Sequence, residues 1–314
     1  MNDPLSEIVR LLNPQAVFAN PISGKGDWAV RFSRFGKPSF CIMLEGSCRL
    51  AVDGHAPTTL SAGDFVLLPT TPGFTISSFV PTRPVYMDPS KVPEGVELRY
   101  GEQTGRPDMR SLDGSFLFDC ADPGLLVSLL PEVVHVQGST RLSQLVQMVG
   151  EESADGKPGN EFMRSRLADM LLVEAMRSTT SGSAPPGLLR GLGDERLAAA
   201  LKRMHAHLDQ SWSVAQLAKI AALSRSSFFE RFTRTVGVAP MEYLLAWRME
   251  IAKEFLRRGE LSVSEIAERV GYGSTSAFSV AFTRHVGQAP SHYARSVSMR
   301  LPIKDWIEGF DSDR

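Results

Sequence analysis

The sequence predicts an α+β protein of two domains, with a strand-rich N-terminal half that ends in two helices and an all-helical C-terminal half. Three observations lead to this prediction: short apolar runs between turn signals in residues 28–82, a Ser-, Gly- and Pro-rich stretch from Ser178 to Gly193, and a helical pattern that occurs twice after it. A chain of 314 residues is long enough for two domains. We therefore expect a first domain at residues 1–178, a linker at 179–193, a second domain at 194–300 and a tail at 301–314.

The strand-rich half is divided by turn residues. Asp53-Gly54 is a hairpin signal between two apolar runs, and Gly63-Asp64 precedes the short strand Phe65–Leu68, which Pro69 ends. Short strands at such close spacing predict a barrel or a sandwich. Helical spacing then begins at residues 141–152 and continues at 161–177.

The second of these helices has an apolar stripe that is wide for a helix covering one side of a barrel. Met163, Leu167, Met170 and Leu171 follow the three- and four-residue spacing of one helix face. We expect this stripe to pair two copies of the chain, so the protein is predicted to be a homodimer.

Composition indicates a globular protein whose two halves differ in charge. Hydrophobic residues make up 43% of the chain and charged residues 22%, which is ordinary for a domain with a core. Residues 1–195 hold 17 Lys and Arg against 23 Asp and Glu, a net charge of −6, whereas residues 196–300 hold 15 against 8, a net charge of +7. A basic domain joined to an acidic one is typical of proteins in which one half binds a polyanion.

Cysteine use and hydropathy indicate the compartment. Cys41, Cys48 and Cys120 show no metal-type spacing, so we interpret them as reduced thiols of a cytoplasmic protein. The N-terminus has no signal-peptide pattern, and no apolar run approaches the ~18–20 residues that span a bilayer. The sequence thus predicts a cytoplasmic protein with no membrane partner.

The second domain contains an internal repeat. Residues 213–218 (SVAQLA) match residues 262–267 (SVSEIA), and further matches follow after a shift of one residue. They begin with two aromatic positions and continue with a Gly, an Ala-Pro pair and a Tyr in each copy. The shift falls between two predicted helices, where an insertion is tolerated.

Each copy of the repeat predicts two short helices with defined ends. Ser213-x-x-Gln216 and Ser262-x-x-Glu265 are capping boxes that begin the first helix of each copy. In the first copy, Phe228 and Phe232 lie on one face of the second helix, and Gly237 ends it. Such a pair is a helix-turn-helix; the alternative, a helical repeat that binds protein or nothing, is weakened because two copies are too few for a stable solenoid. We expect helix-turn-helix units at about 213–237 and 262–287.

These motifs resemble the AraC/XylS family of transcriptional regulators, over about residues 194–299. The family's most specific pattern lies in the second unit, between Ile266 and Tyr293, and is present here. The resemblance implies that a long helix, Pro240–Arg258, joins the two units, and that the domain binds double-stranded DNA. The family usually places Ser or Thr before the two prolines, whereas this chain has Ala239 and Ala289. Each following helix therefore lacks an N-cap hydroxyl worth about 1 kcal/mol.

The resemblance places base contacts on the helix face opposite the inward aromatic residues. We expect Phe229 to contact a thymine methyl group and Glu230 to accept a hydrogen bond from cytosine N4; the alternative for Glu230 is an ion pair with Arg234 at i+4. The second unit has no charge or long amide at its base-reading positions, which indicates weaker reading. A solvated surface role is the alternative for each phosphate contact. The residues expected to contact DNA are Arg225, Ser226, Phe229, Glu230, Thr233, Arg234, Thr275, Ser276, Ser279, Val280, Thr283 and Arg284, with His285 as a further phosphate contact.

The first domain resembles a cupin, over about residues 15–178. Gly63-Asp64-x-Val66-x-x-Pro69 is similar to a cupin motif, and the strands followed by two helices are similar to the sensor half of one AraC subfamily. Metal-binding cupins need histidines on neighbouring strands, but residues 40–44 contain none, and His55 and His135 lie far apart in the sequence. We therefore expect no metal and no cofactor. A small organic effector is expected among four aromatic residues, with a plain core role as the alternative for each: Trp28, Phe32, Phe40 and Phe74.

Three classes of protein fit parts of this sequence. An enzyme fused to a DNA-binding unit would need a histidine cluster, for a cupin oxygenase or isomerase, or closely grouped cysteines, for a DNA-alkyl transferase; neither is present. A purely architectural DNA-binding protein would not need the strand-rich half. We therefore predict a sequence-specific transcriptional regulator with no catalytic residues. Its expected partners are double-stranded DNA, a second copy of the chain, RNA polymerase and a small organic effector.

Overall fold

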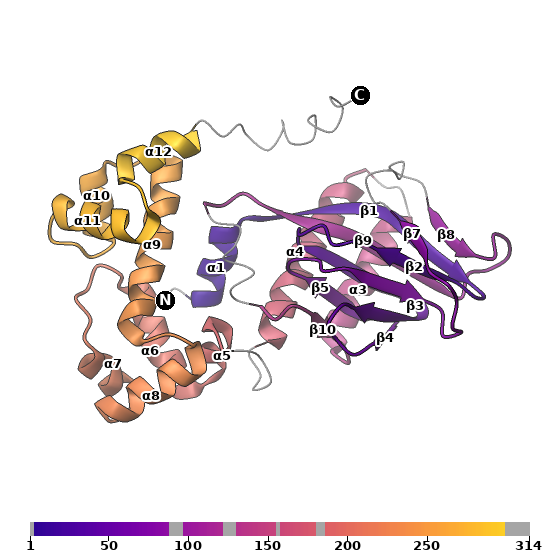
Figure 1. The fold of residues 1–314 in the computed structure, drawn as a ribbon, viewed down its shortest axis with the longest axis horizontal. Helices are drawn as coiled ribbons and strands as arrows, with labels where there is room; N and C mark the ends of the chain where they lie inside the picture. The colour runs from indigo at the N-terminus through magenta and orange to yellow at the C-terminus, as the bar shows by residue number, and fades with distance from the viewer. Residues whose placement is uncertain (1–2, 88–96, 122–129, 155–157, 180–185, 299–314) are drawn as a thin grey trace. The chain divides into compact units, whose positions relative to one another are not determined.

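The computed structural model describes residues 3–87, 97–121, 130–154, 158–179 and 186–298, and Figure 1 shows its ribbon. The chain divides into two compact units: a strand-rich unit of residues 14–118 and 126–183, and a helical unit of residues 1–13, 119–125 and 184–314. The predicted tail at 301–314 and residues 180–185 of the predicted linker lie outside the described residues.

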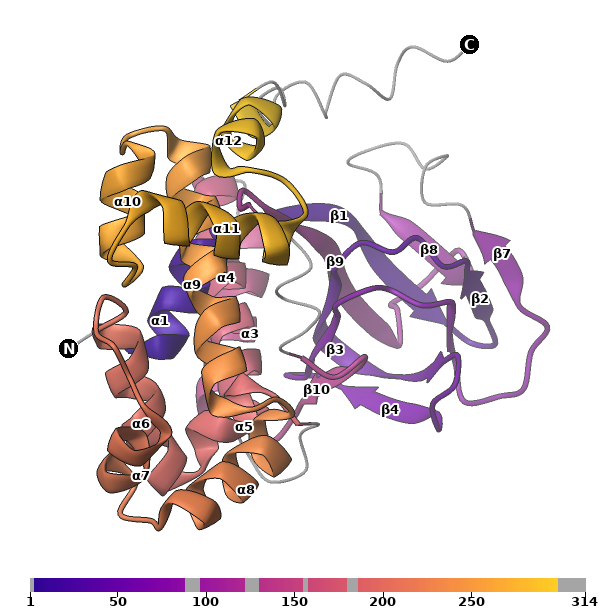
Figure 2. The same cartoon turned by 60° about the vertical axis from the view of Figure 1, so that its left-hand side comes forward.

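The strand-rich unit is one curled sheet in which the strand order is β7-β2-β6-β3-β9-β1-β8, with β4, β5 and β10 paired off this path. The long strand β3 holds the sheet together, because its first half pairs with β5 and β9 and its second half with β4 and β6 (Figure 2). The bounds are β1 Pro14–Lys25, β2 Ala29–Phe32, β3 Ser39–Val52, β4 Thr58–Ser61, β5 Phe65–Leu68, β6 Phe74–Ser77, β7 Val85–Met87, β8 Leu98–Gly101, β9 Met109–Phe118 and β10 Val134–Val136.

Side chains alternate between the two faces of this sheet. Cys41 lies opposite Asp113, and Met43 opposite Ser111, in the antiparallel ladder of β3 and β9. Met43 belongs to the core on the inner face of the curl, which we call the inner face. The outer face is covered by helices α3 Thr140–Ala154 and α4 Asn160–Ser178.

Helix α4 buries only part of its predicted apolar stripe. Leu167 and Leu171 are fully buried, but Met163 and Met170 are exposed. The residues that complete the buried side are Ala168, Leu172, Ala175 and Met176.

The helical unit contains the predicted second domain together with two additional pieces of chain. Helix α1 packs against α6, and Asp119–Ala121, directly after β9, also belongs to this unit. The bounds are α1 Pro4–Leu12, α5 Leu188–Gly193, α6 Glu195–Ala206, α7 Val214–Ile220, α8 Arg225–Val236, α9 Pro240–Arg258, α10 Val263–Arg269, α11 Thr275–Val286 and α12 Pro290–Ser298.

Helix α5 lies in the stretch that the sequence predicts as linker. Its Leu188 and Leu189 are buried, and Gly191 packs so closely that an added Cβ would lie 2.9 Å from Leu201 and 3.0 Å from Val236. These apolar contacts with α6 and α8 give residues 188–193 a packed structure despite their Gly- and Pro-rich surroundings.

The helix bounds reproduce the repeat found in the sequence. Helices α7 and α10 both have seven residues, and α8 and α11 both have twelve. The turn of the second unit, 270–274, is one residue longer than the turn of the first, 221–224. The predicted fold class, a strand-rich cupin-like domain with following helices and a helical domain of two helix-turn-helix units, is confirmed.

Candidate DNA-binding surface

The first helix of each unit begins at the predicted capping box. Ser213 Oγ accepts from the Gln216 amide while Gln216 Oε1 accepts from the Ser213 amide at 2.8 Å. Ser262 and Glu265 make the same pair of bonds. Reciprocal capping satisfies amides that the helix itself leaves without partners, so both helices start at corresponding residues.

The second helix of each unit, α8 or α11, also has a serine cap, which the sequence analysis missed. Ser224 Oγ accepts from the Ser227 amide at 3.1 Å, and Ser274 Oγ accepts from the Ala277 amide at 3.2 Å. The two serines are 50 residues apart, the interval of the repeat. That interval was the signal that could have identified them.

Aromatic side chains anchor these two helices. Phe228 and Phe232 are fully buried, with ring centroids 5.5 Å apart. Phe278 and Phe282 repeat this arrangement at 5.6 Å. Because the aromatic residues occupy one face, the opposite face of each helix is directed to solvent.

The long helix α9 runs between the two helix-turn-helix units (Figure 1). Its Arg248 donates to the Leu208 carbonyl at 3.0 and 2.7 Å and to the Gln210 carbonyl at 2.8 Å, which ties α9 to the chain between α6 and α7. In the first unit, Arg231 Nε lies 2.7 Å from Asp194 Oδ2 and so connects α8 to the N-cap of α6. Burial raises the pKa of Asp194, but the hydrogen bond from Arg231, those from the Leu197 and Arg196 amides and the charge of Arg231 together outweigh burial and lower the pKa.

The exposed face of α8 carries the residues predicted to read DNA. Arg225, Ser226, Glu230 and Arg234 are exposed. Phe229 is 45% exposed, which is unusual for a large aromatic ring without a partner surface. Thr233 is half-buried, and its hydroxyl oxygen has no hydrogen-bond partner among the described residues.

Glu230 has an exposed carboxylate. Among the described residues it makes no ion pair or hydrogen bond, and the alternative pairing with Arg234 is not formed. A carboxylate on a surface that approaches phosphates is unfavourable unless it gains a donor there. The free state of Glu230 is thus compatible with reading a base.

The corresponding face of α11 is apolar or weakly polar. Val280 is 70% exposed, Thr275 and Ser276 are exposed, and the Thr283 hydroxyl donates to the Ser279 carbonyl at 2.7 Å. A shallow, open hollow on this helix is lined by Ser279, Val280, Thr283 and Arg284. The predicted phosphate contacts Arg284 and His285 are exposed.

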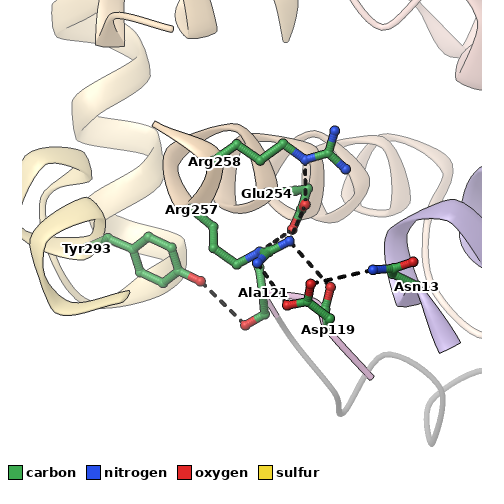
Figure 3. Close-up of polar contacts among 7 residues, drawn as sticks. All are labelled: Asn13, Asp119, Ala121, Glu254, Arg257, Arg258 and Tyr293. Atoms are coloured by element: carbon green, nitrogen blue, oxygen red, sulfur yellow. Dashed lines mark hydrogen bonds and ion pairs between the residues drawn. The ribbon is translucent and has the colours of Figure 1, made fainter. Parts of the chain in front are cut away.

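The C-terminal end of α9 is held by a network of ion pairs (Figure 3). Arg257 contacts Glu254 at 2.9 Å and Asp119 Oδ1 at 2.9 Å, and Arg258 contacts Glu254 at 2.7 Å. Burial raises the pKa of Glu254, but hydrogen bonds from Arg257 and Arg258 outweigh it and lower the pKa. Asn13 Nδ2 donates to Asp119 at 3.4 Å, and the Tyr293 hydroxyl donates to the Ala121 carbonyl at 3.5 Å.

A second contact brings α1 into the helical unit. The fully buried His205 ring lies 2.9 Å from Glu7 of α1 and 2.6 Å from the Tyr243 hydroxyl, and it packs on Trp247 at 4.4 Å. Burial, with the charge of Glu7 adding to it, raises the pKa of Tyr243. Sequence analysis identified neither this network nor the one at Arg257, because no local pattern links residues so far apart.

The four aromatic residues predicted to line an effector pocket do not all lie on one face of the sheet. Trp28 and Phe32 belong to the inner-face core and Phe74 packs against it. Phe40 lies on the outer face instead, where its ring contacts Phe18 and Phe116, because its neighbour Cys41 faces inward.

The described residues contain no group of three or more His, Cys, Asp or Glu side chains suited to a metal ion. The two histidines of the strand-rich unit pair separately, His55 with Glu132 and His135 with Asp64, each at 3.0 Å. None of the helices in the described segments is long and apolar enough to cross a membrane.

Comparison with known proteins now identifies the family. Residues 3–181 match the Cupin family, and residues 217–296 match the helix-turn-helix domain family. An AraC-like transcription regulator of Streptomyces lividans is 36% identical over 304 residues, which cover 95% of this chain and 99% of that protein. This chain belongs to the AraC/XylS family of transcriptional regulators. A second AraC-like regulator, from Streptomyces antibioticus, is 34% identical and covers 89% of this chain and 94% of its own length.

Among solved structures, the DNA-binding domain of AdpA in complex with a target DNA is 30% identical, covers 35% of this chain and 98% of that chain, and has a TM-score of 0.33. The resemblance to AraC/XylS regulators with a cupin-type N-terminal domain is confirmed. The chain is a transcriptional regulator with a helix-turn-helix DNA-binding domain, and these two relatives are named as transcription regulators.

Proposed function

We propose that this AraC-family regulator reads base sequence chiefly through α8, while α11 contributes methyl contacts and backbone anchoring. The observation that carries the proposal is the exposed and unpaired Glu230 beside the exposed Phe229 ring. The equivalent positions of α11, 50 residues later, are Val280 and Ser279. The two helix-turn-helix units therefore have the same helix arrangement and differ in the side chains proposed to determine specificity.

Each reading residue has a chemical match in the major groove. The Glu230 carboxylate is a pure acceptor and suits cytosine N4, whereas the Phe229 ring suits a thymine methyl group. Arg225, Arg234 and Arg284 supply positive charge for phosphates. Because α9 connects the units within one domain, we expect the two helices to enter groove segments about one helical turn, ~34 Å, apart.

The test is selection of binding sites from a random DNA pool by wild type, Glu230→Ala and Arg234→Ala. Glu230→Ala is expected to lose about 1–3 kcal/mol on the preferred site and to relax the preference at one C·G pair. Arg234→Ala is expected to weaken binding to all sequences alike and to reduce the salt slope by about one unit.

The matched control is Glu260→Ala, which removes an exposed carboxylate after α9 and outside both units. It should leave the selected sequence unchanged. If Glu230→Ala selects the same sequence as wild type with affinity kept or improved, Glu230 does not read a base.

Two further roles belong to this proposal. We infer that the strand-rich unit binds a small organic effector on its inner face and that α4 pairs two copies of the chain. Phe162 and Met170 are both exposed and lie eight residues apart on one face of α4, which supports the dimer. Contact with RNA polymerase and the absence of catalytic activity stay predictions, which follow from the relatives being transcription regulators.

A further inference from the structure

The inner face of the curled sheet holds an acid with no cationic partner. Asp113 lies on β9 opposite Cys41, on the side of the sheet that carries the apolar core. Among the described residues it makes no ion pair, and its Oδ1 atom is shielded from solvent without a hydrogen-bond partner. Burial raises the pKa of Asp113 to about 6, although hydrogen bonding to Cys41 and Ser111 acts in the opposite direction.

A second polar group on the same face also lacks a partner. Tyr100 is 9% exposed, and its hydroxyl oxygen has no hydrogen-bond partner among the described residues. Burial raises the pKa of Tyr100, and the negative charge of Asp113 raises it further. Tyr100 belongs to the same inner-face core as Met43. The Tyr100 ring stacks on Trp28, with centroids 5.7 Å apart.

Two polar groups without hydrogen-bond partners in one apolar interior destabilise the folded state. Each costs about 1–3 kcal/mol if nothing binds it, and each needs an explanation, such as an ordered water, an ion or a ligand. An ionised carboxylate only accepts hydrogen bonds. The missing partner is therefore a donor, and a positively charged donor satisfies both the hydrogen bond and the charge.

We propose that the inner face binds a small organic amine in its protonated form, with the ammonium group donating to Asp113 and the Tyr100 hydroxyl as a second polar contact. The stacked rings of Trp28 and Tyr100 form an aromatic wall on this face, and aromatic faces attract organic cations. This inference rests on the proposed effector role of the strand-rich unit and assigns the chemical class of that effector.

The test measures thermal unfolding and calorimetric binding of the full chain with a panel of amines from methylammonium to phenethylammonium and agmatine. Phenethyl alcohol, which has nearly the shape of phenethylammonium but no charge, is the matched neutral probe. At least one amine should raise the melting temperature and bind about ten- to a hundredfold more tightly than the alcohol, the ratio expected for one charge-assisted bond. Asp113→Asn should reduce this ratio to near one, and Tyr100→Phe should reduce it in part.

The control variant is Asp27→Asn, because Asp27 is an exposed acid of the same unit that makes no ion pair with any described residue; it should bind the amine as wild type does. Equal binding of amine and alcohol would overturn the inference that the ligand is a cation, although the inner face would still bind an apolar effector. No stabilisation by any amine of the panel, in a chain that still selects specific DNA, would overturn the inference and leave the DNA-reading proposal intact. If the chain binds an amine but selects no specific DNA sequence, the DNA-reading proposal is overturned and the amine inference stands.

Discussion

Asp113 has opposite effects on stability and on the proposed binding of an effector. A carboxylate held in an apolar interior without a cation destabilises the folded chain, and the same carboxylate would attract an ammonium group. Sites of this kind are a common reason for a protein to fall short of its greatest possible stability. The pH dependence of unfolding can therefore detect the charge without any ligand.

Asp113→Asn is expected to stabilise the free protein at neutral pH. The folded pKa of about 6 exceeds the ordinary value of 3.8, so the folded state binds the proton more tightly, and stability is lost as pH rises from about 4 to about 6. Above that range the neutral Asn side chain should add about 1–3 kcal/mol, and near pH 4 the gain should disappear. Melting temperatures of wild type, Asp113→Asn and Asp27→Asn between pH 4 and 8 measure this. A less stable Asp113→Asn at pH 7.5 would mean that the charge is already balanced.

Hydrogen bonds to backbone carbonyls and an ion pair together hold helix α9 between the two helix-turn-helix units. Arg248 holds one part of it to carbonyls of the chain before α7, and Arg257 holds its end to Asp119, the residue that follows β9. Asp119 also accepts from Asn13, the residue that precedes β1. The chain passes between the two units at Asn13–Pro14 and at Phe118–Asp119.

Arg257→Ala should destabilise the helical unit by about 1–3 kcal/mol, because it leaves the buried Glu254 with one cation instead of two and frees Asp119. Arg258→Ala is the matched control: Arg258 also contacts Glu254, but its side chain is 49% exposed and does not contact Asp119 among the described residues. Asp119→Asn removes the negative charge that pairs with Arg257 and keeps the backbone carbonyl that accepts from Arg257. Denaturant unfolding of the three variants and of the Asp119–Arg257 double mutant gives the coupling energy. An equal loss in Arg257→Ala and Arg258→Ala, with no coupling to Asp119, would show that the tie does not stabilise α9.

The predictability of this molecule differs between its two units. The helical unit could be predicted because two copies of one pattern support each other: capping boxes, aromatic pairs and Gly ends recur at the same interval. The curled sheet could be predicted as strand-rich, but the face of each strand could not be assigned reliably. Phe40 shows this, since its place on the outer face depends on the pairing of β3 with β9.

The sequence could not show which distant segments join the helical unit. Helix α1 and Asp119 join the helical unit although the strand-rich segments 14–118 and 126–183 lie between them and residue 184 in the sequence, and only tertiary packing brings them there. Helix α5 likewise looked like linker because Gly and Pro surround its two leucines. At the site, the sequence indicated the exposed face of α8, while Asp113 and Tyr100 went unnoticed, since an isolated acid or Tyr in a strand has no local signature.

The whole regulator is expected to be a dimer through α4. Phe162 is 65% exposed and Met170 45%; they lie on one helix face, and Arg166 between them covers part of the Phe162 ring at 5.4 Å. Apolar side chains gathered on one exposed face are typical of protein interfaces. Edge strand β7 offers the competing surface, because Tyr86 is 78% exposed at the end of the sheet order, and unpaired edges also associate.

Introducing carboxylates on one surface at a time shows which of the two forms the dimer. Wild type should sediment as a dimer at about ten micromolar, and the double variant Phe162→Glu/Met170→Glu should sediment as a monomer, because two carboxylates cannot be buried at the interface without partners. Tyr86→Glu should stay a dimer. The monomeric variant should keep the sequence preference set by α8, but its affinity for a site with two copies of the preferred sequence should fall, since it no longer gains from binding both at once. A dimer that survives the α4 variant and dissociates in Tyr86→Glu would place the interface at the sheet edge, and a monomeric wild type would exclude both.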